Sequence, residues 1–208
     1  MKNIITAAVA VIAFVGLSGC TPVTAAAGIG AGIGIAAAQE GGLKTAVTDK
    51  AIHLKVSDLW LSHSGEMYRK LNLTVKEGRV LVAGSVPTAD MRVEAVRLAW
   101  QAEGVRQVIN EIAVDEGGGV TGYVGDAWIS SNLKTQFVFD KKVQSINYNI
   151  ETVNGTVYLM GIAQDNAELT HVLGLARNTR SVKNVVSYVR LRGETPPGVL
   201  EPTTPSAG

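Results

Sequence analysis

The feature that most constrains the fold of this chain is an internal repeat without gaps. Aligning Asp49 with Asp126 gives an offset of 77 residues (126 − 49 = 77), and this offset superimposes apolar and glycine positions throughout. The pairs include Ile52 with Ile129, Gly78 with Gly155, Val80 with Val157, Gly84 with Gly161, and Val105 with Val182. A unit of 68 residues, 49–116 or 126–193, only marginally buries a core by itself, which favours packing of one unit on the other.

The periodicity of the apolar residues predicts the same order of elements in both units. Each unit opens with an apolar stripe at helical spacing, formed by Ile52, Val56 and Leu59 in the first and by Ile129, Leu133 and Phe137 in the second. Asp49 and Asp126 are predicted N-caps of these helices, because a carboxylate favours the positive end of the helix dipole. Segments with apolar residues at alternate positions then flank Glu77-Gly78 and Asn154-Gly155. Asn-Gly between two such segments is typical of a β-hairpin.

A second helix and a last strand complete each unit. The helices are expected over residues 88–102 and 165–178, and the strands over residues 108–114 and 185–191. The order α-β-β-α-β predicts an α+β fold in which two helices cover one face of a three-stranded mixed sheet, with a right-handed crossover through the second helix. Gly84 and Gly161 lie at the end of the second strand of each unit. We expect the backbone conformation to require glycine there, rather than contact with a ligand.

The amino terminus has the pattern of an export signal. Lys2 supplies a positive start, residues 4–15 are an apolar run, and small residues precede Cys20. The run is too short to span a bilayer, which takes about 20 apolar residues. The motif Leu17-Ser18-Gly19-Cys20 is similar to the lipobox of bacterial lipoproteins, and Cys20 is the only cysteine of the chain. We therefore predict a signal peptide over residues 1–19 and lipidation of Cys20, for example with palmitate.

The segments outside the two units have their own compositions. Thr21 follows the cysteine where an aspartate indicates retention in the inner membrane, so we expect the outer membrane, facing the periplasm. Residues 20–48 are rich in Ala and Gly and are predicted to be a tether, or alternatively to include a short apolar segment against the bilayer surface. Residues 117–125 are predicted to be a Gly-rich linker, and the Pro-rich residues 194–208 are predicted to be a disordered tail.

Two segments of each unit carry a resemblance to a known family. Residues 80–86 and 103–112 of the first unit, and residues 154–161 and 181–185 of the second, resemble the BON domain of bacterial envelope proteins. Two such domains after a lipobox resemble the dual-BON outer-membrane lipoproteins. The resemblance covers about 150 of the 208 residues.

The resemblance implies binding of anionic phospholipid and a role in envelope integrity and stress response, without catalysis or a cofactor. In such lipoproteins the second domain engages lipid through its first helix, around an Asp-x-Trp-Ile motif that stands here at residues 126–129. The lipid-binding residues expected from this match are Trp128, Ile129, Ser131, Leu133 and Lys134.

The residues themselves leave two interpretations of Trp128 open. It lies about 100° from Ile129 on the helix, at the edge of the apolar stripe, where a half-exposed indole suits a bilayer interface. Alternatively, it caps the local core or fills the interface between the units. The first unit has Ala51 at the matching position. The second unit is also the more basic, with a net formal charge of +3 (eight basic, five acidic) against −1 (nine basic, ten acidic).

Other classes of function find little support in the sequence. The three histidines are scattered and no cysteine remains for zinc, so no metal site is expected. No nucleophile motif occurs, and Ser62, Ser64, Glu66 and His171 are predicted to be solvated, so we expect no enzyme activity. A net charge of +1 and an exported location argue against nucleic-acid binding.

Two alternatives to lipid binding remain. The same face suits a protein interface with an outer-membrane assembly component or a second copy of the chain. Docking on lipid through basic residues weakens as salt rises, whereas an apolar protein interface does not. A soluble periplasmic protein without lipidation is the third hypothesis. The lipid species, the protein partner and the oligomeric state are not determined by the sequence.

Lipidation of Cys20 is tested by Cys20→Ser. Without the acyl chains that hold the protein at the membrane, the variant is expected to move from the membrane fraction to the soluble periplasmic fraction after a salt wash. Immunoblotting of both fractions measures this. A variant that stays membrane-bound after the wash contradicts the lipoprotein hypothesis.

Overall fold

The computed structural model describes residues 42–115 and 123–196. The predicted signal peptide, Cys20, most of the tether, most of the Gly-rich linker and the end of the tail lie outside these residues. The described residues form two modules, in which the helices and strands follow in the same order.

The first module consists of three helices and three strands. These are α2 (Gly42–His63), α3 (Gly65–Lys70), β1 (Leu71–Lys76), β2 (Arg79–Val86), α4 (Ala89–Ala99) and β3 (Gln107–Val114). Strand β2 is central, antiparallel to β1 and parallel to β3.

The second module repeats this arrangement. Its elements are α5 (Tyr123–Phe139), the 3₁₀ turn η1 (Ser145–Asn147), β4 (Tyr148–Val153), β5 (Thr156–Ala163), α6 (Asn166–Asn178) and β6 (Asn184–Leu191). Strand β5 is antiparallel to β4 and parallel to β6. The predicted α+β fold, two tandem modules with three-stranded mixed sheets, is confirmed.

The first helix of each module begins earlier than predicted, so Asp49 and Asp126 are not N-caps. Helix α2 begins at Gly42, because residues 43–48 include neither Gly nor Pro to stop it, and α5 begins at Tyr123. The two carboxylates instead accept hydrogen bonds from the amides of the hairpin turns at 77–78 and 154–155, at 2.7 to 2.8 Å. The repeated aspartate therefore ties each first helix to its hairpin. Burial raises the pKa of Asp49, and the amide hydrogen bonds oppose this shift.

The hairpin turns have the conformation that Asn-Gly favours. Asn154 and Gly155 have φ of 53° and 81°, and Glu77 and Gly78 have φ of 55° and 73°. Positive φ at both central residues defines a type I′ turn, whose twist matches that of the flanking strands. The predicted hairpins are confirmed in both modules.

The segment with Ser62, Ser64 and Glu66, which are predicted to be solvated, is largely helical. Ser64 is the N-cap of α3, and its hydroxyl accepts a hydrogen bond from the Met67 amide at 3.2 Å. The side chain of Met67 is buried in the core of the first module. This buried apolar residue and the cap explain the helical turn.

Each module has one core between its helices and its sheet. The stripes predicted from the sequence, Ile52 with Val56 and Ile129 with Leu133 and Phe137, are buried there. Trp60 is also buried in the first core, where its indole N–H donates to the Ala95 carbonyl at 3.0 Å. This bond ties α2 to α4.

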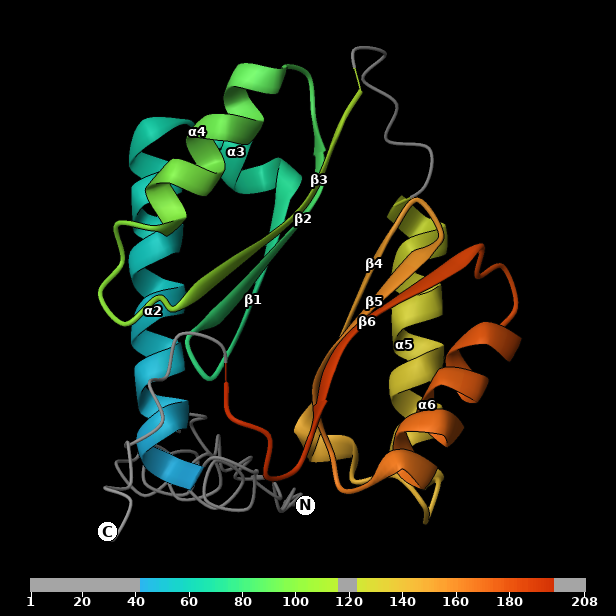
Figure 1. Cartoon of the computed structure of the whole chain (residues 1–208). Coiled ribbons are helices and arrows are strands. Elements are labelled where there is room, and N and C mark those ends of the chain that lie inside the picture. Colours follow the sequence, from blue (N-terminus) through green and yellow to red (C-terminus); the bar gives the residue numbers. More distant parts are fainter. Residues whose placement is uncertain (1–41, 116–122, 197–208) are drawn as a thin grey trace, which may run out of the picture.

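The modules pack sheet against sheet, so the molecule has four layers: helices, sheet, sheet and helices (Figure 1). The central strands β2 and β5 are buried on both faces. On the faces away from the helices they form a third core, composed of Leu81, Ala83, Ile109, Tyr158 and Met160. The contact between the units that their size favours is therefore present.

The two sheets are related by a pseudo-twofold axis, because equivalent residues meet across the interface. The Thr74 hydroxyl donates to Glu151 at 3.2 Å, and the Tyr188 hydroxyl donates to Glu111. Both pairs join positions 77 residues apart, which is the offset of the sequence repeat. Burial raises the pKa of Tyr188, and the bond to Glu111 acts in the same direction. The interface therefore resembles the isologous interface of a symmetric dimer, in which the same surface of both partners meets, but here both partners belong to one chain.

Charged groups join the modules beside this apolar centre. Arg190 of β6 forms an ion pair with Glu77, and only 11% and 12% of the two side chains is exposed. Arg79 lies nearby and donates to the Tyr188 carbonyl at 2.9 Å. Burial lowers the pKa of Arg79, and Arg190 contributes to this shift.

Gly161 allows a close approach of backbones that no other residue permits. Its φ is 155°, and a Cβ at this position would lie 2.2 Å from the Asn147 carbonyl oxygen. Gly84 is equivalent, with a Cβ 2.3 Å from the Lys70 carbonyl. The backbone role expected for both glycines follows from this contact.

Gly161→Ala is therefore expected to lower the free energy of unfolding by about 2 kcal/mol or more, because backbone atoms must shift. Gly174→Ala is the matched control: no atom lies within 4 Å of the added Cβ, and alanine favours the helix by up to about 1 kcal/mol. Urea unfolding followed by circular dichroism measures both. Equal stability of the two variants would contradict the close approach.

Arg190→Ala tests the buried ion pair between the modules. It leaves the Glu77 carboxylate buried without its partner, and we expect a loss of about 3–5 kcal/mol in unfolding free energy. Arg97→Ala breaks the exposed pair with Glu94 and should leave stability unchanged within error. Similar stability of the two variants in guanidinium unfolding would argue against a closed interface.

Candidate functional site

Helix α5 has a second apolar face opposite the one buried in the core. At about 100° per residue, Trp128, Thr135 and Phe139 lie in one row along the helix, and Val138 lies beside it. We call these four residues the outer row. Trp128 is 47% exposed, Val138 65% and Phe139 81%. Large apolar side chains with this exposure on one helix face are typical of an interaction surface.

The structure divides the five residues expected to contact lipid among three places. Ile129 and Leu133 are 2% and 0% exposed and belong to the core, so the expectation that they touch lipid is corrected. They lie on the buried stripe and hold α5 on its sheet. Trp128, which is 47% exposed, and Ser131 lie on the outside of the helix. Lys134 is exposed and lines a cleft between the modules.

The sequence analysis did not identify the exposed residues at the end of α5. Val138 and Phe139 at the end of α5 are followed by Lys141 and Lys142, both exposed. We call residues 138–142 the α5 tip. The spacing of eleven residues between Trp128 and Phe139 was the available signal. Seventy-seven residues earlier, the positions of Phe139, Lys141 and Lys142 hold Ser62, Ser64 and Gly65, so only the second module carries this aromatic and basic tip.

Hydrogen bonds from the second module hold the α5 tip in place. The Asp140 carboxylate contacts His171 Nε2 of α6 at 2.7 Å and accepts the Lys142 amide at 2.8 Å. The hydrogen bond to His171, followed by that from the Lys142 amide, lowers the pKa of Asp140. His171 lies on a helix, as predicted, and 33% of its side chain is exposed, but it is paired with Asp140 rather than fully solvated. The buried Glu168 carboxylate also accepts the Gln144 amide at 2.6 Å, which fixes the chain after the tip.

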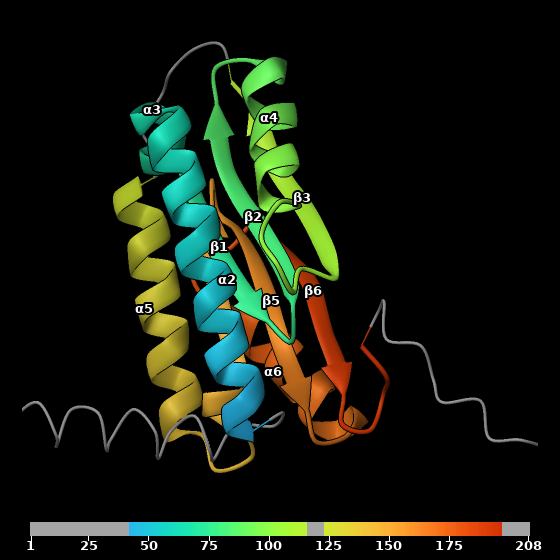
Figure 2. The same ribbon diagram turned by 90° about the vertical axis from the view of Figure 1, so that its left-hand side faces the viewer.

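The α5 tip lies at the same end of the molecule as the start of α2. In Figures 1 and 2, α2 begins at the bottom with Gly42, and α5 ends at the bottom. Cys20 precedes Gly42 in the sequence by 22 residues (42 − 20 = 22). The tip and the start of the first described helix thus face the same direction.

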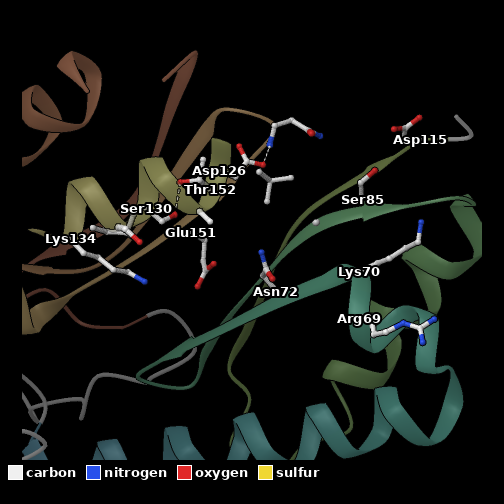
Figure 3. Close-up of a pocket in the computed structure, with 16 residues that line it drawn as sticks. Arg69, Lys70, Asn72, Ser85, Asp115, Asp126, Ser130, Lys134, Glu151 and Thr152 are labelled. Carbon is white, nitrogen blue, oxygen red and sulfur yellow. Dashed lines mark hydrogen bonds between the residues drawn. The ribbon is translucent and has the colours of Figure 1, made fainter. Parts of the chain in front are cut away.

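A cleft lies between the modules beside the edge strands β1 and β4 (Figure 3). Its volume is about 430 Å³. One wall is formed by the first module with Arg69, Lys70 and Asn72, and the other by α5 with Ser130 and Lys134. We call this space the inter-module cleft.

The described residues offer neither a metal site nor a membrane-spanning helix. Within residues 42–115 and 123–196, no group of three or more His, Cys, Asp or Glu side chains could hold a metal ion. In the same ranges no helix combines the length and apolar character needed to cross a bilayer.

Comparison with known proteins gives matches over both modules. The model of the BON domain matches residues 48–116 and 125–193. An uncharacterized protein from the gshII 5′ region of Anaplasma centrale is 42% identical over 147 residues, 70% of this chain and 96% of that protein. A 21 kDa hemolysin of Actinobacillus pleuropneumoniae is 32% identical over 58% of this chain and 61% of its own length. The outer membrane lipoprotein DolP of Haemophilus influenzae is 28% identical over 70% of this chain and 76% of its own length.

Proposed function

This chain belongs to the BON-domain family, and from that premise we propose that it is an envelope protein which docks on anionic phospholipid through its second module. Lipidated Cys20 anchors it to the outer membrane on the periplasmic side, and docking supports the integrity of the envelope. Similarity to an outer membrane lipoprotein and the lipobox motif support this location.

The observation that carries the proposal is the outer row ending in the basic α5 tip. An aromatic ring that is 81% exposed has no partner within its own module, and insertion into a bilayer interface removes it from water. Lys141 and Lys142 follow after Asp140, so the α5 tip has two basic residues and one acidic residue. Each lysine contributes about 1 kcal/mol near an anionic leaflet. A helix end with apolar residues and adjacent lysines is typical of interfacial binding.

The position of the tip agrees with an anchor at Cys20. The tip lies at the end of the molecule where α2 begins, so the described chain starts on the side that would face the membrane. Trp128 and Ser131 continue the contact along α5, and Lys134 adds charge at its flank. Ile129 and Leu133 support this surface from inside the module.

A protein interface is the second candidate, and the first module provides a specific observation for it. Val47, Leu54 and Leu61 of α2 are exposed and recur every seven residues, so they form one apolar row on the outside of the molecule. Such a row suits a helix of an outer-membrane assembly component or of a second copy. Binding through this row would persist at high salt and without vesicles.

Lipid docking is tested by sedimentation with vesicles. The probe is residues 20–208 with Cys20→Ser, mixed with vesicles of phosphatidylcholine alone or with phosphatidylglycerol. The protein is expected to pellet with the anionic vesicles at low salt and to be released at moderate salt. Phe139→Glu and Trp128→Glu are each expected to weaken this binding about tenfold or more, because a charge replaces an inserted ring.

Trp100→Glu is the matched control, since Trp100 is 51% exposed on the first module and lies outside the proposed surface. It should pellet like the unsubstituted protein. Failure of the folded protein to pellet with either vesicle would reject lipid docking and leave membrane contact to Cys20. An equal loss in all three variants would show that the α5 surface has no special role.

A further inference from the structure

A histidine and a carboxylate are paired at equivalent positions of the two modules. In the second module His171 Nε2 lies 2.7 Å from Asp140 Oδ2. In the first module His63 Nδ1 lies 3.7 Å from Glu94 Oε1. The offset of the repeat carries His63 onto Asp140 (140 − 63 = 77) and Glu94 onto His171 (171 − 94 = 77), so the imidazole and the carboxylate exchange places between the copies. Each pair joins the end of the first helix of its module to the second helix.

The pair of the second module lies within the proposed docking surface. Asp140 stands in the α5 tip between Phe139 and the two lysines, and the net formal charge of residues 138–142 is +1 (two basic, one acidic). Helix α2 begins at the end of the molecule where α5 ends, so His63, its last residue, lies at the opposite end (Figure 1). The carboxylate of the tip therefore repels an anionic lipid surface, whereas the pair of the first module is remote from it.

The hydrogen bond between Asp140 and His171 identifies which ring nitrogen carries a proton. This bond, followed by that from the Lys142 amide, lowers the pKa of Asp140. An ionised carboxylate has no proton to donate, so Nε2 of His171 is the donor. A second proton added at Nδ1 leaves the hydrogen bond in place. It changes only the charge of the pair, from one negative charge to none.

The other charged groups around His171 come from the tip and from α6 itself. Those that line a cavity of about 670 Å³ together with His171 are Lys141, Lys142, Asp165 and Glu168. Both acidic groups are already engaged. Glu168 accepts the amides of Gln144 and Gln164 at 2.6 Å, and Asp165 accepts the Glu168 amide at 2.8 Å.

The strands beneath α6 add few titratable groups. Strand β5 has no charged residue, while Arg190 of β6 is paired with Glu77 and Arg192 follows that strand. Burial raises the pKa of Tyr148 of β4, and the charge of Glu168 acts in the same direction, so this phenol stays neutral. Among all these side-chain types, imidazole is the one that ordinarily changes its charge between pH 5 and 8. The ring of His171 is 33% exposed, so water can exchange a proton with it.

We propose that His171 makes the docking of the second module on anionic lipid responsive to pH. At acidic pH the imidazolium cancels the charge of Asp140, and the two lysines of the tip face the lipid uncompensated. At alkaline pH the carboxylate opposes them. The inference rests on the proposed function, because it concerns the regulation of the same surface.

Sedimentation with vesicles at two pH values tests the response. The probe is residues 20–208 with Cys20→Ser, mixed at low salt with vesicles of phosphatidylcholine and phosphatidylglycerol, whose phosphodiester keeps its charge throughout. We expect binding about fivefold tighter at pH 5.5 than at pH 8, because one elementary charge near an anionic leaflet has about this effect.

Two substitutions separate the charge of the pair from its hydrogen bond. His171→Gln keeps an N–H donor for Asp140 but cannot take up a proton, so its binding should be equal at both pH values and close to that of the unsubstituted protein at pH 8. Asp140→Asn removes the acidic charge of the tip, and at pH 8 it should bind about fivefold more tightly than the unsubstituted protein.

His63→Gln is the matched control, since it removes the histidine of the equivalent pair at the far end of the molecule. It should keep the fivefold response. Groups common to all variants, such as the amino terminus, change charge alike in each, so only the loss of the response in His171→Gln assigns it to this ring. Circular dichroism at both pH values confirms that the variants fold.

Nitrogen-15 NMR of the histidine rings tests the protonation without vesicles. Between pH 8 and pH 5.5, Nδ1 of His171 should gain a proton while Nε2 remains protonated at both values. A ring that shows no change over this range would overturn the proposal.

The outcomes distinguish this inference from lipid docking itself. Equal binding to anionic vesicles at both pH values, or a full response in His171→Gln, would overturn the role of His171 and leave docking intact. Loss of the response in His63→Gln would assign it to the first module instead. Absence of binding at either pH would reject docking on lipid, and the inference with it.

Discussion

The packing of one sheet face on the other is the contact on which the rest of this structure depends. Strands β2 and β5 are apolar on both faces, and only a second sheet removes the outer face from water. A module of this size buries only a marginal apolar surface alone, and the third core between the sheets adds to it. The pairs Thr74 with Glu151 and Glu111 with Tyr188 set the alignment of the sheets, because each joins equivalent positions of the repeat.

This packing determines which surfaces remain for binding. With the inner faces of both sheets covered, the helices α2 and α4 lie on one outside and α5 and α6 on the other (Figure 1). The outer row of α5 is therefore exposed, and the edges of β1 and β4 lie along a shared cleft.

The repeat preserves the scaffold, while the copies differ in the residues on their surfaces. Both modules keep the aspartate that holds the hairpin turn and the glycine that allows the close approach after the second strand. At the positions of Trp128, Phe139 and Lys142 the first module has Ala51, Ser62 and Gly65. Backbone geometry needs the shared residues, whereas surface residues can differ, and at these three positions the second copy has two aromatic residues and a lysine.

The sequence by itself determined what depends on local periodicity and on the repeat. The α-β-β-α-β order, the type I′ turn at Asn154 and Gly155, and the buried stripe with Ile129 and Leu133 follow from spacing along one chain segment. The same spacing placed Trp128 at the edge of the stripe.

Only the tertiary structure decided what depends on contacts between distant segments. The use of Asp49 and Asp126 as hairpin ties, the pairing of His171 with Asp140, and the position of Lys134 at the cleft all need residues that are far apart in sequence. The alignment of the two modules also depends on residues that are far apart in sequence. An apolar run such as β5 indicates that both faces of the strand are buried, but it does not indicate what covers them. Side-chain pairing across such a face is set by the packing of whole sheets, which no local pattern encodes.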